Sequence, residues 1–237
     1  MNCCSCDGSA CGHQLCVGKV PIFSSLGQQD LDRVASMIRH REYRKGEAIF
    51  AEGDTPDALI IVNEGSAKAF KYTPGGQEQI LYIFDEGNFF GEQYLFRSQI
   101  AAYHVQALEP LKVCTLSKAH FEQLLHSYPD IAVMVIQELG RRMARLENAL
   151  QSSGVRNLDA RISALLLDFS EKYGSDTPEG LLLRLPLNRE GMANYLGIAR
   201  ETFSRKLGQL ESERLIRSVD NKSILLLNIE ALQQTAG

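Results

Sequence analysis

Hydrophobic and polar positions along the chain change their spacing twice. Leu31, Val34 and Ile38 recur at helical intervals, so we expect a short helix over Gln28 to Arg41. Beyond it the apolar positions form brief runs separated by glycine. These runs predict strands at 48–50, 58–62, 67–72, 79–84, 103–107 and 111–116. Short strands at such intervals are typical of a jelly roll or barrel.

After the predicted strands the periodicity becomes helical. Phe121, Leu124 and Leu125 form a short apolar face, and Pro129 then opens a longer helix that runs to about Gln151. Four apolar residues of this helix are spaced four, three and four apart: Leu139, Met143, Leu146 and Leu150. That rhythm favours a two-stranded dimer seam, with a polar reverse face that includes Arg141 and Arg142. Packing of the four on their own domain is the alternative.

The last regime combines helices with a few strands. An amphipathic helix is expected over Leu158 to Tyr173 and a strand over Leu181 to Leu187, before two shorter helices over Arg189 to Leu196 and Arg200 to Glu213. A glycine lies between the two short helices, and a strand–turn–strand pattern follows. Helix, glycine turn and second helix predict a helix-turn-helix, and the trailing strands predict a wing.

Together these patterns predict an α+β chain with four parts. They are a cysteine-rich segment at 1–19, a β-roll domain at 20–128, a dimerisation helix at 129–157 and a winged helix-turn-helix at 158–237. With 44% hydrophobic residues the chain can bury a sizeable core, and no run approaches the ~20 apolar residues of a membrane span. We therefore expect a cytoplasmic protein without an export signal or a membrane partner.

Charge distinguishes the C-terminal module from the whole chain. The net charge of the 237 residues is −4, which offers nucleic acid no overall attraction. Residues 184–217, however, include seven basic and four acidic residues, so the local net charge is +3. The residues expected to contact DNA lie at the start of the second short helix: Arg200, Glu201, Thr202, Ser204 and Arg205. Arginine can bond to guanine and glutamate can accept from cytosine.

Five of the six cysteines lie between Cys3 and Cys16, and Cys114 stands alone. In a chain without an export signal, thiols gathered at one end favour a metal or redox site over structural disulfides. Three kinds of site stay open on this basis: an iron–sulfur cluster, a Cys4 zinc site, and a reversible disulfide between the N-terminal segment and Cys114. Haem ligation by a cysteine or a histidine is a further alternative, and Cys114 can also be only a buried structural thiol.

Two stretches of sequence resemble one known family. The run Leu187 to Ile198, followed by Arg200 to Leu207, resembles the recognition module of the cyclic-AMP receptor and fumarate-and-nitrate-reduction regulator (Crp/Fnr) superfamily. Glu201, Ser204 and Arg205 match the Glu-x-x-Ser-Arg pattern of the fumarate-and-nitrate-reduction (FNR) branch. Gly87 to Leu95 is similar to the signature of the family's effector domain.

The resemblance implies a β-roll of the cyclic-nucleotide-binding type, a dimer helix and a winged-helix reader of palindromes such as TTGAT-N4-ATCAA. It implies a homodimer that binds double-stranded DNA, and we expect RNA polymerase to be a partner. An enzyme is not expected, because the chain has no P-loop, no Gly-x-Ser-x-Gly elbow and no His-Glu-x-x-His.

Resemblance also suggests which effector is sensed. Cyclic-nucleotide binders of the family follow their Gly-Glu turn with an Arg-Ser or Arg-Thr pair that grips the phosphate, whereas Ala101 and Ala102 hold those positions here. The cysteines resemble the FNR arrangement of a [4Fe-4S] cluster. The ligands expected on this basis are Cys6, Cys11, Cys16 and Cys114, with Cys3 and Cys4 as alternates for the first. The spacing differs from the family pattern, and Leu146 stands where the FNR branch has a repelling acid.

Overall fold

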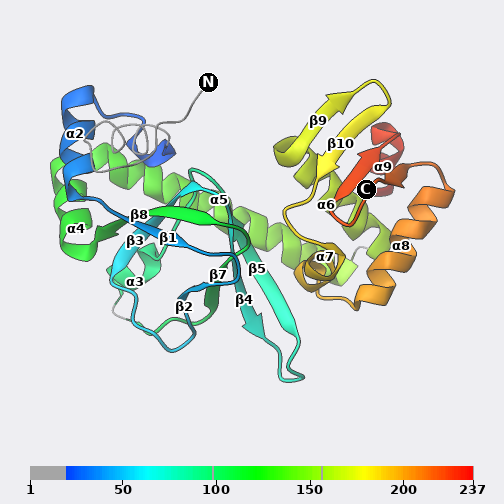
Figure 1. Cartoon of the computed structure of the whole chain (residues 1–237), viewed down its shortest axis with the longest axis horizontal. Coiled ribbons are helices and arrows are strands. Elements are labelled where there is room, and N and C mark those ends of the chain that lie inside the picture. The colour runs from blue at the N-terminus through cyan, green and yellow to red at the C-terminus, as the bar shows by residue number, and fades with distance from the viewer. Residues whose placement is uncertain (1–19, 98, 156, 237) are drawn as a thin grey trace. The chain divides into compact units, whose positions relative to one another are not determined.

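The computed structural model describes residues 20–97, 99–155 and 157–236. The predicted N-terminal ligands Cys3, Cys4, Cys6, Cys11 and Cys16 lie outside these residues. Contacts divide the described chain into two compact units (Figure 1). The first combines residues 20–70 with 82–143, and the second combines residues 71–81 with 144–236.

The first unit opens with a 3-10 turn, η1 (Pro21–Phe23), and a helix, α2 (Gln28–Met37). The predicted extension of this helix to Arg41 is wrong, because Arg39–Tyr43 form strand β1. This strand pairs antiparallel with a later strand, from Arg39 opposite Thr115 to Tyr43 opposite Leu111. Its side chains are mostly exposed, so its sequence lacks the alternation of apolar and polar residues that would predict a strand. Pairing with the neighbouring strand defines it instead.

The six strands predicted from the apolar runs are present, with bounds within two residues of those expected. They are β2 (Ala48–Phe50), β3 (Ala58–Glu64), β4 (Ala67–Tyr72), β5 (Glu78–Phe84), β7 (His104–Ala107) and β8 (Leu111–Ser117). Two short elements that the pattern did not predict, β6 (Phe89–Phe90) and α3 (Glu92–Phe96), overlap the effector-domain signature.

These strands form two four-stranded sheets. Sheet A has the order β1-β8-β3-β6, and sheet B has the order β2-β7-β4-β5. Side chains from both sheets meet in one hydrophobic cluster, the roll core, which includes Phe50, Ile60, Phe90, Val105 and Val113. The predicted jelly roll is therefore confirmed.

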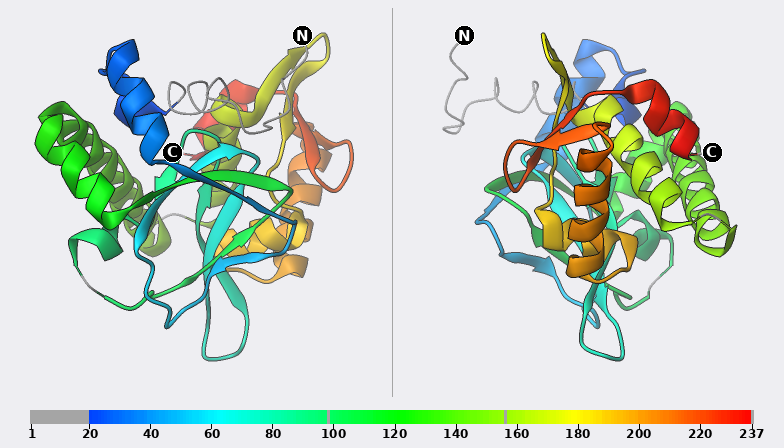
Figure 2. Two further views of the ribbon diagram at one scale, coloured as in Figure 1. Left: turned by 60° about the vertical axis from the view of Figure 1, so that its left-hand side comes forward. Right: turned by 90° about the vertical axis from the view of Figure 1, so that its right-hand side faces the viewer.

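The other face of sheet A supports a second cluster, here called the outer core. Leu59 and Ile61 of β3 and Cys114 and Leu116 of β8 pack there against residues of η1, α2, α4 (Lys118–Ser127) and α5 (Pro129–Val155). Figures 1 and 2 show α2 and α4 beside the first part of α5 on one side of the roll. Sheet A therefore separates two cores, because successive side chains of a strand point to opposite faces.

The second unit contains α6 (Leu158–Tyr173), α7 (Arg189–Leu196), α8 (Arg200–Ser212) and α9 (Ile229–Ala236). Strands β9 (Gly174–Thr177), β10 (Gly180–Arg184), β11 (Ile216–Ser218) and β12 (Ser223–Leu226) form a sheet of order β11-β12-β10-β9. The predicted helices and wing strands are present, the strand predicted at 181–187 ends at Arg184, and α9 was not predicted. Among the helices of the described residues, none has the length and unbroken apolar character that a bilayer span needs.

Candidate functional sites

The helix-turn-helix is built from capped helices. Asn188 begins α7 by accepting a hydrogen bond from the Gly191 amide at 2.8 Å. Gly197 ends it with a φ of +68°, a left-handed conformation that glycine adopts without strain. The chain then turns into α8, as the sequence predicted.

Recognition helix α8 has an apolar and a polar face. Phe203, Leu207 and Leu210 are buried in the core of the unit. The predicted DNA contacts lie in the first turns of the helix: Arg200, Glu201 and Arg205 are exposed, and Thr202 and Ser204 are half-buried. Glu201, Ser204 and Arg205 share a face through their spacing of three and four residues. The first turns of α8 thus present acidic, hydroxyl and guanidinium groups together.

Several basic residues of the module have partners within it. Lys206 binds Asp159 of α6 at 2.6 Å, Arg189 donates to the Ser218 hydroxyl at 2.9 Å, and Arg217 pairs with Glu179. These three residues contributed to the local charge of +3, but they hold helices and wing together. The sequence could not separate them from Arg200 and Arg205, because their partners are distant in the chain.

Serine 218 also links the wing to the recognition helix. Its backbone amide donates to Glu211 Oε1 of α8 at 2.6 Å. Hydrogen bonding from Ser218 lowers the pKa of Glu211, because the ionised carboxylate is the better acceptor. The register between α8 and β11 is therefore fixed by a charge-assisted hydrogen bond.

Cys114 lies in the outer core, and its side chain is only 2% exposed. It is opposite His40 of β1 and opposite Ile61 of β3, so the three residues form one row across sheet A. Val20, four residues after Cys16 in the sequence, packs in the same cluster. Within residues 20–97, 99–155 and 157–236, no three His, Cys, Asp or Glu side chains are grouped to hold a metal.

Aromatic rings pack together in the roll core. Phe50 lies against Phe90, Tyr94 and Tyr103, with ring centroids 5.8 to 6.1 Å apart. Ala101, one of the two residues in place of the phosphate-gripping pair, is buried in the same core. The amide of Ala102 donates to the Tyr94 hydroxyl at 3.3 Å.

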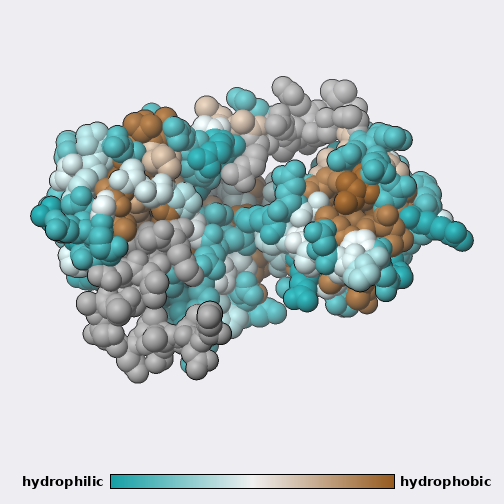
Figure 3. All heavy atoms as spheres, turned by 90° about the horizontal axis from the view of Figure 1, so that it is seen from above, coloured by the Kyte–Doolittle hydropathy of each residue, from teal (hydrophilic) through white to brown (hydrophobic). Residues whose placement is uncertain are grey.

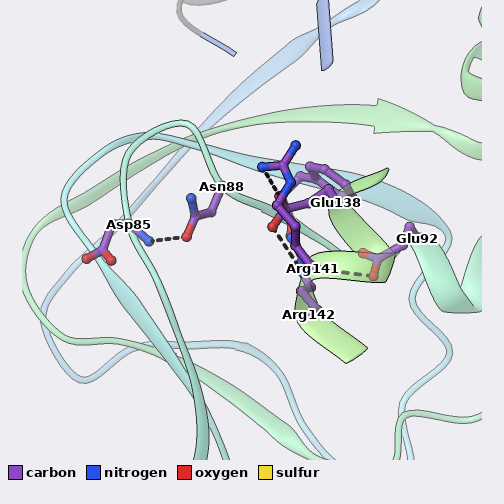
Figure 4. Close-up of polar contacts among 7 residues, drawn as sticks. Asp85, Asn88, Glu92, Glu138, Arg141 and Arg142 are labelled. Carbon is purple, nitrogen blue, oxygen red and sulfur yellow. Dashed lines mark hydrogen bonds and ion pairs between the residues drawn. The ribbon is translucent and has the colours of Figure 1, made fainter. Parts of the chain in front are cut away.

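Glu92 of the Gly-Glu turn has an ion-pair partner from α5. Arg142 lies 3.2 Å from its Oε1 (Figure 4). It also donates to the Phe89 carbonyl at 2.6 Å. The guanidinium stands 4.6 Å from the Phe89 ring centroid. Burial raises the pKa of Glu92, and Arg142 acts in the opposite direction.

The position of Arg142 adds to the sequence-based picture. Arg142 was expected on the polar face opposite the seam, and its side chain is 15% exposed and contacts the roll. Sequence reasoning missed this pair because Glu92 and Arg142 are 50 residues apart and only the fold brings them together.

The predicted seam of α5 is only partly exposed. Leu139 is half-buried and packs against the outer core of its own domain, which is the alternative that the sequence left open. Met143 and Leu146 are 62% and 41% exposed, and the side chain of Leu150 lies outside the described part of the helix. Val133 and Ile136 are exposed as well. With Gly140 and Met143 they form a stripe spaced three, four and three apart, here called the α5 stripe.

Exposed apolar residues also occur in the second unit. Val219, Leu227 and Ile229 lie near the wing and the start of α9. Figure 3 shows hydrophobic residues bordered by hydrophilic ones on the face that it draws.

Comparisons with known proteins agree with this architecture. Residues 40–128 match the model of the cyclic nucleotide-binding domain, and residues 160–235 match the Crp-like helix-turn-helix domain. Together the two models cover most of the chain. This chain belongs to the Crp/Fnr family of DNA-binding transcription regulators.

Relatives of this Crp/Fnr regulator include a probable transcriptional regulator, flp, of Lacticaseibacillus casei. It is 29% identical over 221 residues, which is 93% of this chain and 98% of the relative. The fumarate and nitrate reduction regulatory protein of Yersinia pestis is 27% identical, over 90% of this chain and 85% of its own.

Solved structures share the fold of the Crp/Fnr regulator. A CooA mutant from Carboxydothermus hydrogenoformans has a TM-score of 0.78 at 18% identity, with 92% of this chain and 95% of that chain covered. A CRP/FNR family regulator from Thermus thermophilus has a TM-score of 0.69 at 25% identity, covering 84% of this chain and 98% of its own. Crp/Fnr regulators bind DNA and function as dimers, which agrees with an exposed recognition helix and an exposed α5 stripe.

Proposed function

We propose that this regulator senses oxygen or redox state through a [4Fe-4S] cluster held by Cys114 and three N-terminal cysteines. Cys6, Cys11 and Cys16 are the proposed partners, with Cys3 and Cys4 as alternates for the first. One observation carries the proposal: Cys114 faces the outer core, where Val20 also packs. Val20 follows Cys16 by four residues in the sequence.

Of the four proposed ligands, Cys114 lies within the described residues. Cys114 supplies one buried thiol on a rigid strand, and iron–sulfur clusters are held by four cysteine thiolates. When bound, the cluster supplies reactivity toward oxygen. The chain's own part is to anchor one thiolate in β8 and to connect it, through the outer core, to the first turns of α5.

A cyclic nucleotide is a poorer candidate for the effector. Aromatic rings fill the roll core beside Ala101. Glu92 is already paired with Arg142. A reversible disulfide would use the same thiols and would respond to oxidants without iron. Zinc would hold the thiols without redox chemistry.

Anaerobic purification followed by iron, sulfide and zinc analysis tests the sensor. We expect about four iron and four sulfide per chain and a visible absorption that decays in air. Cys114→Ala should abolish this absorption. A single Cys4→Ser variant should retain it, since Cys4 is an alternate for the first position alone. A colourless protein without iron or sulfide after anaerobic reconstitution contradicts the cluster, and mass mapping of disulfides then tests the thiol switch.

We further propose that α8 reads palindromes similar to TTGAT-N4-ATCAA. Glu201→Ala and Arg205→Ala should each weaken binding to such a site by about 1–3 kcal/mol, because each removes a base-edge contact. Glu213→Ala is the matched control for Glu201→Ala, since it removes the same charge at the other end of α8. Unchanged specific binding in both recognition variants would refute this assignment.

A further inference from the structure

His40 is a polar neighbour of the Cys114 sulfur. The two residues are direct cross-strand partners in the β1–β8 ladder. Imidazole Nδ1 lies 3.6 Å from Sγ, within hydrogen-bonding distance for sulfur. The side chains lie on the same side of sheet A, because directly opposite residues of an antiparallel pair do so.

The neighbours of Cys114 in the outer core are apolar, so the contact of its sulfur with His40 differs from them in chemistry. Cys114 is buried among apolar side chains of the outer core, such as Leu59, Ile61 and Phe89. Hydrocarbon groups donate no hydrogen bonds, whereas imidazole carries an N–H on at least one ring nitrogen. His40 lies on β1, an exposed strand at the edge of sheet A. Its ring therefore approaches the sulfur from the solvent-facing side of the outer core.

We propose that His40 is a positioning residue that donates a hydrogen bond from Nδ1 to Cys114 Sγ when that sulfur ligates the cluster. A ligating thiolate carries no proton, so Nδ1 must be the donor. Donation withdraws electron density from the sulfur and fixes its orientation. Hydrogen bonds to ligand sulfurs raise the reduction potential of iron–sulfur centres and hold the ligand in place. The inference rests on the proposed cluster.

The test compares the wild type with His40→Val, which removes the donor and suits a strand, and His40→Asn, whose amide N–H replaces Nδ1. Arg41→Val is the matched control, because Arg41 is exposed on the same strand but lies opposite Val113. Each protein is reconstituted anaerobically with iron and sulfide. Iron content, the one-electron midpoint potential and the rate of absorbance loss to a fixed chelator concentration are then measured.

We expect His40→Val to have a more negative midpoint potential and to lose its cluster about tenfold faster than the wild type. His40→Asn and Arg41→Val should remain close to the wild type. If His40→Val does not fold, as judged by circular dichroism, His40→Leu replaces it with the same expectation.

Two different failures can be told apart. A wild type that takes up no iron or sulfide refutes the proposed cluster, and the role of His40 with it. A wild type with a full cluster, together with an unchanged potential and decay rate in His40→Val, overturns the role of His40 alone. Equal loss in His40→Val and Arg41→Val also overturns it, because β1 as a strand would then be responsible.

Discussion

Gly65, between β3 and β4, occupies a position in the roll where the backbone leaves no space for a side chain. Its φ is +86°, and an added Cβ would meet the Pro110 carbonyl oxygen inside van der Waals contact. Gly76 has a similar φ of +76° but open space around it. We expect Gly65→Ala to lower the free energy of unfolding by roughly 3 kcal/mol and Gly76→Ala by about 1 kcal/mol. Urea denaturation measures both, and equal losses would show that the close approach to Pro110 is unimportant.

Glu211 makes stability depend on pH. Its pKa is lowered in the folded protein, so its ionised form stabilises the fold. This contribution is complete above the ordinary pKa of 4.5 and is lost as pH falls through the folded value. Thermal unfolding of Glu211→Gln should therefore differ from the wild type most near pH 6 and least near pH 3. A difference that is constant with pH would contradict the role of its charge.

At the scale of elements, helices with a periodic apolar face were predictable from the sequence, whereas a strand with exposed side chains was not. The bounds of α6 are those expected, because its apolar face is buried and Asn157 caps it by accepting from the Ala160 amide at 2.9 Å. Strand β1 was not predicted, since its identity depends on pairing with β8. For the candidate sites, α8 was predictable from local pattern, whereas the Glu92–Arg142 and His40–Cys114 contacts depend on tertiary structure.

Helix α5 carries a prediction about assembly. The α5 stripe is exposed in the single chain, and its spacing suits pairing with the same helix of a second copy. Lysine substitution at Ile136 or Met143 should raise the dimer dissociation constant by tenfold or more, since each buries a charge in the seam. Gln137→Lys adds the same charge about 100° round the helix and should change it little. Sedimentation velocity over a range of concentrations measures the constant, and equal effects of all three would argue against this seam.

At the scale of the whole molecule, two recognition helices in a dimer require matched half-sites. Inserting five base pairs between the half-sites turns one of them to the opposite face of the duplex. Affinity should then fall by about 10²-fold or more, to the level of DNA with one half-site scrambled, because the second contact no longer adds avidity. Gel-shift titration at fixed salt compares the DNAs. Equal binding to the spaced and unspaced sites would mean that the chain binds each half-site independently.

The aromatic rings in the roll have a consequence for how this regulator can change over evolution. Replacing a large buried aromatic residue by alanine typically costs 3–5 kcal/mol, a large part of the stability of a domain. Opening a chamber among Phe50, Phe90 and Tyr94 would therefore require compensating gains elsewhere before a small molecule could be accommodated. A descendant that binds a metabolite inside the roll would therefore have to gain stability elsewhere in the domain first.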